Sequence, residues 1–490
     1  MGKDIIVGLD IGTTKIACFI GQRADDGKIR IIGFGRVESK GVERGVVRNI
    51  KDTAASIESA VSIASEQAGV SVEEVYVGIA GQHIKSIQNI GTIVIPSEHK
   101  YIEQEDVDRL IEEQHGIALP AGEDIIHVFP QNYVVDGEEL GPDVAPVGVA
   151  GKQLKSNFHI VTGNTTSLNN IYESVSRAGL TIKNVVLEPI ASALATLDDT
   201  DREAGVAMVD IGGGTTDIAI FHEGIIRHTC VLPLAGNAIT NDIKENCKIL
   251  RSQAETLKTR FGSCLPQHVK EDDIISIPGL RTQPPREISM RTLAEIIKTR
   301  TDTILEQVDY EIKKSHLEKH LNAGIVLTGG GAQLRHIKEL TEFNTGLDTR
   351  IGLPDEHLAK DTDGEIVNTM YATGIGLVLF GFEELDQMRA HGLADVEPVA
   401  AADGNDDGVK DDLFDLPPTP DPDTIFATDV VEQQPVEVDG SVKNDPKKSG
   451  DDSKGKGRFR HLLSNSIEKY FNKVFNDNSV QNEIDEEQDF

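Results

Sequence analysis

Short apolar runs alternate with longer helical stretches over residues 4–381. The runs IIVGLDIG, GVAMVDIG and AGIVLTGGG are rich in β-branched residues and each meets a glycine turn, which is typical of buried strands. Thr53–Ala68 and Arg291–His316 are predicted helices. Strands that alternate with helices in this way indicate an α/β protein built around a mostly parallel sheet.

Two of the apolar runs resemble each other. Residues 7–15 read VGLDIGTTK and residues 207–217 read AMVDIGGGTTD, so equivalent positions lie 200 residues apart. A repeat at this distance predicts a duplicated domain, with each copy forming one half of the molecule.

Composition and charge narrow the classes of function. The 490 residues carry a formal net charge of −33, which excludes broad nucleic-acid binding because phosphate neutralisation needs a basic surface. The four cysteines show no C-x-x-C spacing, so neither a disulfide framework nor a zinc site is predicted, and a reducing cytosol fits best. The start of the chain lacks the pattern of a signal peptide, and no window approaches 20 apolar residues. Any attachment to a membrane is therefore expected to be peripheral.

The composition changes after residue 389. Residues 390–457 contain seventeen acidic residues, six lysines and seven prolines, with no helical or alternating pattern. We expect a disordered linker here, since such a segment buries too little apolar surface to offset its ordering entropy, and a third folded domain is the alternative.

Periodicity returns in residues 458–476, RFRHLLSNSIEKYFNKVFN. Apolar residues recur there at helical spacing and form one stripe, with arginines and lysines on the other side. A helix of this kind lies in a membrane interface and does not span it. Docking into a partner's groove or onto the chain itself is the alternative, and residues 477–490 form an acidic tail that would weaken attachment to anionic lipid. Tyr470 belongs to the apolar stripe, and the predicted membrane-contacting residues are Phe459, Leu462, Leu463, Ile467, Phe471, Val474 and Phe475.

Glycine and threonine turns follow the two similar strands. Backbone N–H groups and hydroxyls in such turns can bind phosphate, and the aspartate that precedes each turn can face the accompanying cation. Two facing turns can hold a triphosphate from both sides, with Lys15 reaching the β and γ phosphates. The first turn offers Asp10, Gly12, Thr13, Thr14 and Lys15; the second offers Asp210, Gly212, Gly213, Gly214, Thr215 and Thr216.

A third glycine turn follows the strand Ile325–Leu327 and is expected to open a helix at about Gln333. Its residues Gly329, Gly330, Gly331 and Ala332 are candidates for the α-phosphate and adenosine side of a nucleotide. Each turn taken alone is also compatible with a simple tight turn; the three together favour nucleotide binding.

The segments DIGTTK, DIGGGTTD and TGGGA, in this order, resemble the phosphate 1, phosphate 2 and adenosine motifs of the actin, sugar kinase and Hsp70 ATPase superfamily. Further stretches, among them VYVGIAGQHIKS, HVFPQNYVVDG and VLEPIASALA, resemble the bacterial FtsA family of actin-like cell-division proteins. The resemblance implies two actin-like (ribonuclease H-like) halves, ATP as ligand, and Mg²⁺ held through water by Asp10 and Asp210.

The same resemblance implies a division of the chain. The first half would comprise residues 1–83 and 162–195, with a family-specific subdomain inserted at 84–161. The second half would comprise residues 196–389, and its outer subdomain would lie at about 234–320. The linker, the amphipathic helix and the acidic tail would follow at 390–457, 458–476 and 477–490.

Three further residues acquire roles from the resemblance. Glu188 matches an acidic position near the attacking water, although a helix N-terminal charge favoured by the macrodipole is an equal alternative. Glu255 and Lys258 match a pair that contacts the ribose, with an ordinary i, i+3 ion pair on a helix as the alternative.

The resemblance also implies partners. A protein of this family would polymerise on the cytoplasmic face of the inner membrane, tether FtsZ filaments through the FtsZ C-terminal tail, and recruit later divisome proteins at the septum, with slow ATP hydrolysis. The FtsZ-binding face would lie at residues 234–320, where a solvated basic surface is the alternative explanation for Arg281, Arg286, Arg291 and Arg300. The alternative functions for a chain of this fold are those of a small-molecule kinase and of another membrane-linked actin-like adaptor, of the pilus-assembly type.

Overall fold

The computed structural model describes residues 4–24, 27–141, 144–270, 272–278, 284–360 and 362–390. The predicted linker beyond residue 390, the amphipathic helix and the acidic tail lie outside the described residues.

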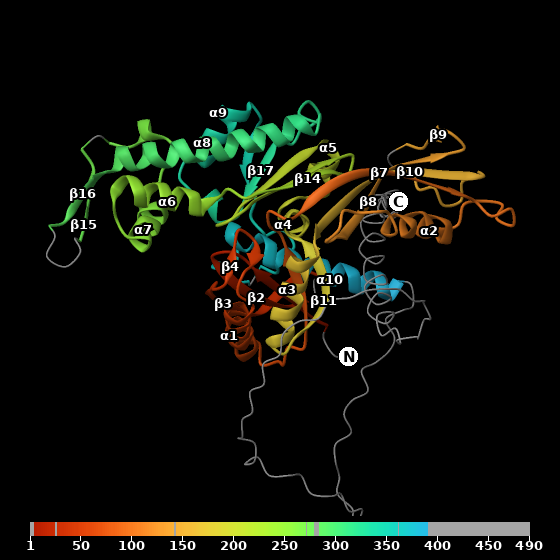
Figure 1. Ribbon diagram of the computed structural model, residues 1–490, viewed down its shortest axis with the longest axis horizontal. Helices are drawn as coiled ribbons and strands as arrows, with labels where there is room; N and C mark the ends of the chain where they lie inside the picture. Colours follow the sequence, from red (N-terminus) through yellow and green to blue (C-terminus); the bar gives the residue numbers. More distant parts are fainter. Residues whose placement is uncertain are drawn as a thin grey trace, which may run out of the picture.

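Two halves of the same architecture form the body of the molecule (Figure 1). The elements of the first half are β1 (Ile5–Ile11), β2 (Lys15–Arg23), β3 (Ile29–Glu38), β4 (Val42–Glu43), β5 (Val46–Val47), α1 (Ile50–Ala68), β6 (Glu74–Ile79), α3 (Thr165–Arg177), β11 (Thr181–Leu187) and α4 (Glu188–Thr196). Those of the inserted subdomain are β7 (Lys85–Val94), α2 (Gln104–His115), β8 (Glu123–Val135), β9 (Glu138–Glu139) and β10 (Gln153–Asn164).

The second half follows along the chain. Its elements are α5 (Asp199–Ala204), β12 (Val206–Ile211), β13 (Thr216–His222), β14 (Ile225–Leu232), α6 (Gly236–Cys247), α7 (Arg251–Phe261), the 3-10 helix η1 (Pro266–His268), β15 (Ile274–Ile277), β16 (Arg286–Ser289), α8 (Met290–Lys314), β17 (Ile325–Thr328), the 3-10 helix η2 (Gly330–Gln333), α9 (Ile337–Thr345), β18 (Thr349–Ile351) and the 3-10 helix η3 (Thr369–Tyr371). The helix α10 (Ala372–Ala390) then returns to pack against β1 and α4 of the first half.

The two large sheets have matching strand orders. The first is β3-β2-β1-β6-β11 and the second is β14-β13-β12-β17-β18. In each sheet, three antiparallel strands are followed by strands that pair in parallel. This correspondence confirms the predicted duplicated α/β fold.

Helices cover the large sheets and explain the continuous apolar strands. In the first half, α1 packs against β2 and β3, while α10 packs against β1. Six of the seven residues of β1 and all six of β12 are buried, as expected for strands enclosed on both faces.

The helices α4 and α10 cross at the junction of the halves, and they approach unusually closely. A Cβ atom on Gly376 of α10 would lie 1.8 Å from the carbonyl oxygen of Ala191 in α4. Only a residue without a side chain allows this approach, so Gly376 sets the spacing of the two helices.

The inserted subdomain is an antiparallel sheet of order β7-β10-β8-β9 with α2 on one face. It has its own hydrophobic core, which includes Ile93, Leu110 and Phe158. Figure 1 shows it projecting on the opposite side of the molecule from α6, α7 and the β15–β16 hairpin.

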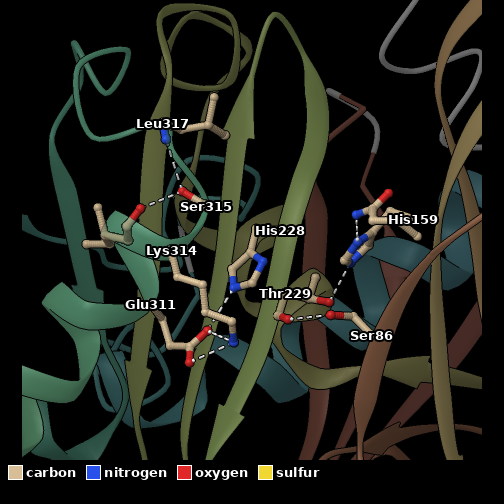
Figure 2. A network of polar contacts seen from close by, with 10 residues as sticks. Ser86, His159, His228, Thr229, Glu311, Lys314, Ser315 and Leu317 are labelled. Carbon is tan, nitrogen blue, oxygen red and sulfur yellow. Dashed lines mark hydrogen bonds and ion pairs between the residues drawn. The ribbon is translucent and has the colours of Figure 1, made fainter.

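A polar seam joins the inserted subdomain to β14 of the second half (Figure 2). The His159 Nε2 atom lies 2.8 Å from the Thr229 hydroxyl, and its Nδ1 atom lies 3.0 Å from the Gln88 amide nitrogen. Burial lowers the pKa of His159 to about 3, so this imidazole is neutral at physiological pH and the seam does not depend on its charge.

Two further bonds of the seam involve Gln131 in β8. Its side-chain amide donates to the backbone carbonyl of Ile226 at 2.8 Å, and its backbone carbonyl accepts from the Arg227 guanidinium at 2.7 Å. The chain enters and leaves the inserted subdomain through the first half, so the seam gives this subdomain a second attachment, to the other half.

One observation corrects an expectation from sequence. The helix expected from Gln333 begins at Ile337, because Gly330–Gln333 form a 3-10 turn. No helix in the described part of the chain has the length and apolarity needed to span a bilayer.

The crossing of α4 and α10 generates a prediction. Gly376→Ala forces the helices apart and should lower the free energy of unfolding by about 3 kcal/mol, measured by urea denaturation of the full chain. Gly364→Ala is the matched control, since a Cβ atom there meets nothing within 4 Å. Equal stability of the two variants would show that the close crossing is not required.

Candidate functional site

The first glycine turn connects β1 to β2 as a tight hairpin. Asp10 pairs in register with Ala17, which brings Lys15 back to the aspartate. The Lys15 ammonium donates to Asp10 Oδ2 at 2.8 Å. Burial alone would lower the pKa of Lys15, but Asp10 and the nearby carboxylates Asp210 and Glu188 raise it, so this lysine is firmly charged.

The second glycine turn connects β12 to β13 in the same way. Asp210 pairs with Asp217, and the N–H of Gly212 donates to the carbonyl of Thr215 at 2.9 Å. The start of α6 lies on this turn, because the N–H of Gly236 donates to the carbonyl of Gly212 at 3.1 Å. The duplication therefore positions two equivalent loops, one from each half.

The two loops face and touch each other. A Cβ atom on Gly213 would lie 2.3 Å from Thr14 Cγ2, and one on Gly214 would lie 2.4 Å from Thr13 Oγ1. Glycine is thus required at both positions, and the loop backbones are close enough to contact one ligand together.

Four buried or partly buried carboxylates lie at the glycine loops, and three of them, Asp10, Asp210 and Glu188, interact with the charge of Lys15. Asp10, Asp210 and Asp217 are 4%, 7% and 3% exposed, while Glu188 at the start of α4 retains some solvent contact. Burial and then the charges of Asp10, Asp217 and Asp210 raise the pKa of Glu188 well above its usual value. Burial, followed by the Asp210 charge, does the same for Asp217. The site thus holds more negative charge than its single lysine offsets.

Sequence reasoning did not include Asp217 among the site residues. Its Oδ2 atom accepts from the Thr215 hydroxyl at 3.1 Å, while its buried Oδ1 atom has no hydrogen-bond partner in the described part of the chain. The signal was present, because Asp217 ends the DIGGGTTD segment and lies opposite Asp210 in the hairpin.

The site residues fit the implied nucleotide and cation. The loops offer backbone donors for phosphate, and a divalent cation would compensate the excess of carboxylates and the unpaired Asp217 oxygen. Among the described residues, no three His, Cys, Asp or Glu side chains are placed to ligate a metal directly. A cation held through water by Asp10 and Asp210 remains a prediction.

Asp210 also connects the site to the crossing helices. Its Oδ2 atom accepts from Ser192 of α4 at 2.8 Å and from Thr373 of α10 at 3.2 Å. The two hydroxyls are 3.0 Å apart. One carboxylate of the second glycine loop thus contacts both helices at the junction of the halves.

The third glycine turn packs against the end of β12. Gly329 has a φ of 82°, and a Cβ atom there would lie 2.2 Å from Asp210 Oδ1. A Cβ atom on Gly331 would lie 2.4 Å from Ile211 Cγ2, and Ala332 is buried beside it. The turn is therefore adjacent to the second glycine loop, and a Cβ atom on Gly330 would meet nothing within 4 Å.

Glu255 and Lys258 lie on α7, close to the same loop. They form an i, i+3 ion pair at 2.9 Å, which was the alternative to a contact with the ribose. Lys258 also donates to the carbonyl of Gly236 at 3.1 Å and to Thr240 at 2.9 Å, and α6 begins at Gly236 on the second loop. Glu255 and Lys258 therefore form an ion pair and also lie close to the second glycine loop. Their contact with a ribose stays a prediction.

Comparisons with known proteins agree with this architecture. The family model described as "Cell division protein FtsA" matches residues 207–376, and "SHS2 domain inserted in FTSA" matches residues 81–162. A model described as "Hsp70 protein" matches residues 166–229. The matching halves, with a glycine-rich loop from each at their junction, define an actin-like ATPase fold.

Curated relatives specify the family. The chain is 37% identical to the cell division protein FtsA of Pseudomonas aeruginosa over 380 residues, covering 78% of this chain and 90% of the relative. It is 33% identical to FtsA of Escherichia coli K12 over 402 residues, covering 81% and 93%. The chain belongs to the FtsA family of cell division proteins.

A solved structure supports the fold alone. The PilM-PilN type IV pilus biogenesis complex contains a chain that superposes with a TM-score of 0.55 at 15% identity, covering 77% of this chain and 98% of that one. This similarity extends the actin-like fold to proteins of other functions and does not favour a pilus function here.

The crowded carboxylates generate a pH prediction. Glu188 binds its proton more tightly in the folded chain than in the unfolded chain, so stability falls as pH rises above the usual glutamate value. Glu188→Gln removes this loss and should stabilise the ligand-free protein by about 1 kcal/mol at pH 8 and by less at pH 5.

Urea denaturation at the two pH values checks this prediction. Glu203→Gln is the control, since Glu203 is exposed on α5. A gain from Glu188→Gln that does not depend on pH would contradict the assigned cause.

Proposed function

We propose that this protein is an ATP-binding, actin-like cell-division protein that polymerises on the cytoplasmic face of the inner membrane and tethers FtsZ filaments there. It would also recruit later divisome proteins to the septum. The observation that carries the proposal is the pair of facing glycine loops at the junction of the two halves, in a chain of the FtsA family.

In this proposal each site residue has a task. The N–H groups of Gly12–Thr14 and Gly213–Thr215 bind the phosphates, and Lys15 adds a positive charge. Asp10 and Asp210 accept hydrogen bonds from the water shell of Mg²⁺, which supplies charge neutralisation when bound. Glu188, whose raised pKa suits proton transfer, orients a water molecule for slow hydrolysis.

Nucleotide would act as a switch between arrangements of the halves. A ligand that contacts both loops favours the state in which they are close, and that state would fit the filament. Asp210 contacts α4 and α10 at the junction, so its ligand contacts and the crossing of the helices are physically connected.

The FtsZ tail would bind the outer subdomain of the second half at about residues 234–320. Two of its predicted basic residues lie within ion-pair distance of a carboxylate in the chain, and a third is hydrogen-bonded. Arg300 forms an ion pair with Asp242 at 2.6 Å, Arg291 lies 3.8 Å from Glu295, and Arg286 donates to the carbonyl of Cys247. Arg281 lies outside the described residues. An acidic tail would have to compete with these local partners.

Membrane attachment would come from residues 458–476, with residues 390–457 as the tether. The support is the apolar stripe in the sequence, because this segment lies outside the described residues. The kinase and pilus-adaptor alternatives gain no support beyond the shared fold.

A vesicle sedimentation assay tests the proposal. With Mg·ATP and vesicles containing anionic lipid, the full chain should pellet and carry FtsZ with it. A chain ending at Gly457 should stay in the supernatant, and Phe471→Glu should weaken pelleting strongly, because a charge in the apolar stripe is costly to bury.

Filaments on the pelleted vesicles, seen by negative-stain microscopy, would support polymerisation. Equal pelleting of the full chain and the shortened chain would contradict the role of residues 458–476. Pelleting without FtsZ would contradict the tethering function.

A further inference from the structure

A cavity of about 390 Å³ opens between the two halves beside the facing loops. Thr13 and Arg44 line it from the first half, and Gly213, Gly214 and Arg251 line it from the second. The cavity therefore borders both phosphate loops, and it has one arginine from each half.

Arg44 stands in a backbone conformation that does not suit it. It lies with Gly45 in the two-residue turn between β4 and β5, and their φ angles are 48° and 72°. Two positive φ angles in such a hairpin favour asparagine, aspartate or glycine over a long side chain. Strain of this kind is typical of positions retained for function, so the arginine side chain itself is the feature to explain.

The turn is fixed against both loops. The N–H of Gly45 donates to the Thr13 hydroxyl at 3.0 Å, and a Cβ atom on Gly214 would lie 2.9 Å from the Cα atom of Arg44. Arg44 thus belongs to the first half but lies directly on the second phosphate loop.

Arg251, the first residue of α7, is held by neutral partners. Its Nη1 atom donates to Asn241 Oδ1 at 2.8 Å and its Nη2 atom to Asn237 Oδ1 at 2.9 Å. Amide oxygens orient the guanidinium without neutralising it. Its positive charge therefore remains available to an anion in the cavity.

The other cations near the loops are already compensated. Lys15 contacts Asp10 and Lys258 contacts Glu255, whereas neither Arg44 nor Arg251 forms an ion pair within the described part of the chain. Glu43 also lines the cavity, so the two arginines leave one net positive charge in a chain whose net charge is −33. A local positive charge next to two phosphate-binding loops suits an oxyanion.

We propose that Arg44 and Arg251 bind the terminal phosphoryl group of a nucleoside triphosphate, an inference that rests on the nucleotide binding proposed above. Guanidinium groups make paired hydrogen bonds to phosphate oxygens, which Lys15, committed to its carboxylates, cannot replace. Because one arginine comes from each half, a triphosphate bridges the halves through these side chains and a diphosphate does not. The pair therefore distinguishes the two nucleotide states.

Affinity measurements on the full chain test this inference. The probes are Mg·AMPPNP, a triphosphate analogue that resists hydrolysis, and Mg·ADP, each titrated calorimetrically into wild type, Arg44→Asn and Arg251→Gln. Each variant should bind Mg·AMPPNP about tenfold or more weakly, because a charge-assisted bond to phosphate is lost. Binding of Mg·ADP should change less than about threefold.

The variants offer internal controls. Asparagine suits the turn, so Arg44→Asn should unfold at an equal or higher temperature than wild type, which separates loss of the charge from loss of the fold. Arg44→Lys should keep part of the affinity for Mg·AMPPNP. Arg177→Gln removes one positive charge from α3, where Arg177 pairs with Glu173, and should leave both affinities unchanged.

Inorganic phosphate added with Mg·ADP distinguishes the bound phosphoryl group from free phosphate. A rise in ADP affinity that phosphate causes in wild type, and that Arg44→Asn abolishes, assigns the released phosphate to the same arginines. A loss confined to Mg·AMPPNP, with no effect of phosphate, assigns them to the triphosphate alone.

Two results would separate the failures. Equal changes for AMPPNP and ADP, or none, in Arg44→Asn and Arg251→Gln would overturn the role of the arginines while leaving nucleotide binding intact. Failure of the wild-type chain to bind either nucleotide would contradict the proposed function itself.

Discussion

The close crossing of α4 and α10 is the contact on which the arrangement of the two halves depends. Both helices lie at the junction, and the absence of a side chain at Gly376 lets their backbones approach to a distance that no other residue allows. The hydroxyls of Ser192 and Thr373 meet at Asp210, so this crossing also positions a carboxylate of the second glycine loop. Packing at the junction and the chemistry of the site are thus determined by the same few atoms.

The site combines exact backbone geometry with unfavourable electrostatics. The facing loops leave no room for a side chain at Gly213 and Gly214, whereas the carboxyl groups of Asp10, Glu188, Asp210 and Asp217 crowd together at a site with one lysine. Their mutual repulsion lowers the stability of the ligand-free chain and is relieved by any cation that the cleft admits. The carboxylates thus lower the free energy of unfolding of the ligand-free chain, and a bound cation would raise it again. Such a loss of stability at a binding site is common.

Much of the fold could be predicted from local sequence. The copies VGLDIGTTK and AMVDIGGGTTD indicated the duplication because the strand, the turn and the candidate phosphate-binding residues are all local features. The predicted start of the helix after the third glycine turn, at about Gln333, was wrong, because a glycine turn does not specify whether a 3-10 turn or an α-helix follows it directly.

Features made by residues far apart in the chain could not be predicted. The seam joins His159 to Thr229 and Gln131 to Ile226, and no local pattern marks those pairs. The ion pair of Arg300 with Asp242 could not be predicted from local sequence either. It reduces the basic character expected for the surface of residues 234–320. Asp217 is a different case, because its position opposite Asp210 follows from the hairpin register once both strands are recognised.

The seam restricts how the two halves can rotate away from each other. The inserted subdomain is covalently continuous with the first half and hydrogen-bonded to the second. It is therefore attached to both halves when one rotates relative to the other. A rotation that separates the glycine loops must therefore either slide β14 along the inserted sheet or bend the connections at β7 and β10. In either case, the inserted sheet would change its position relative to one of the two halves when the glycine loops separate.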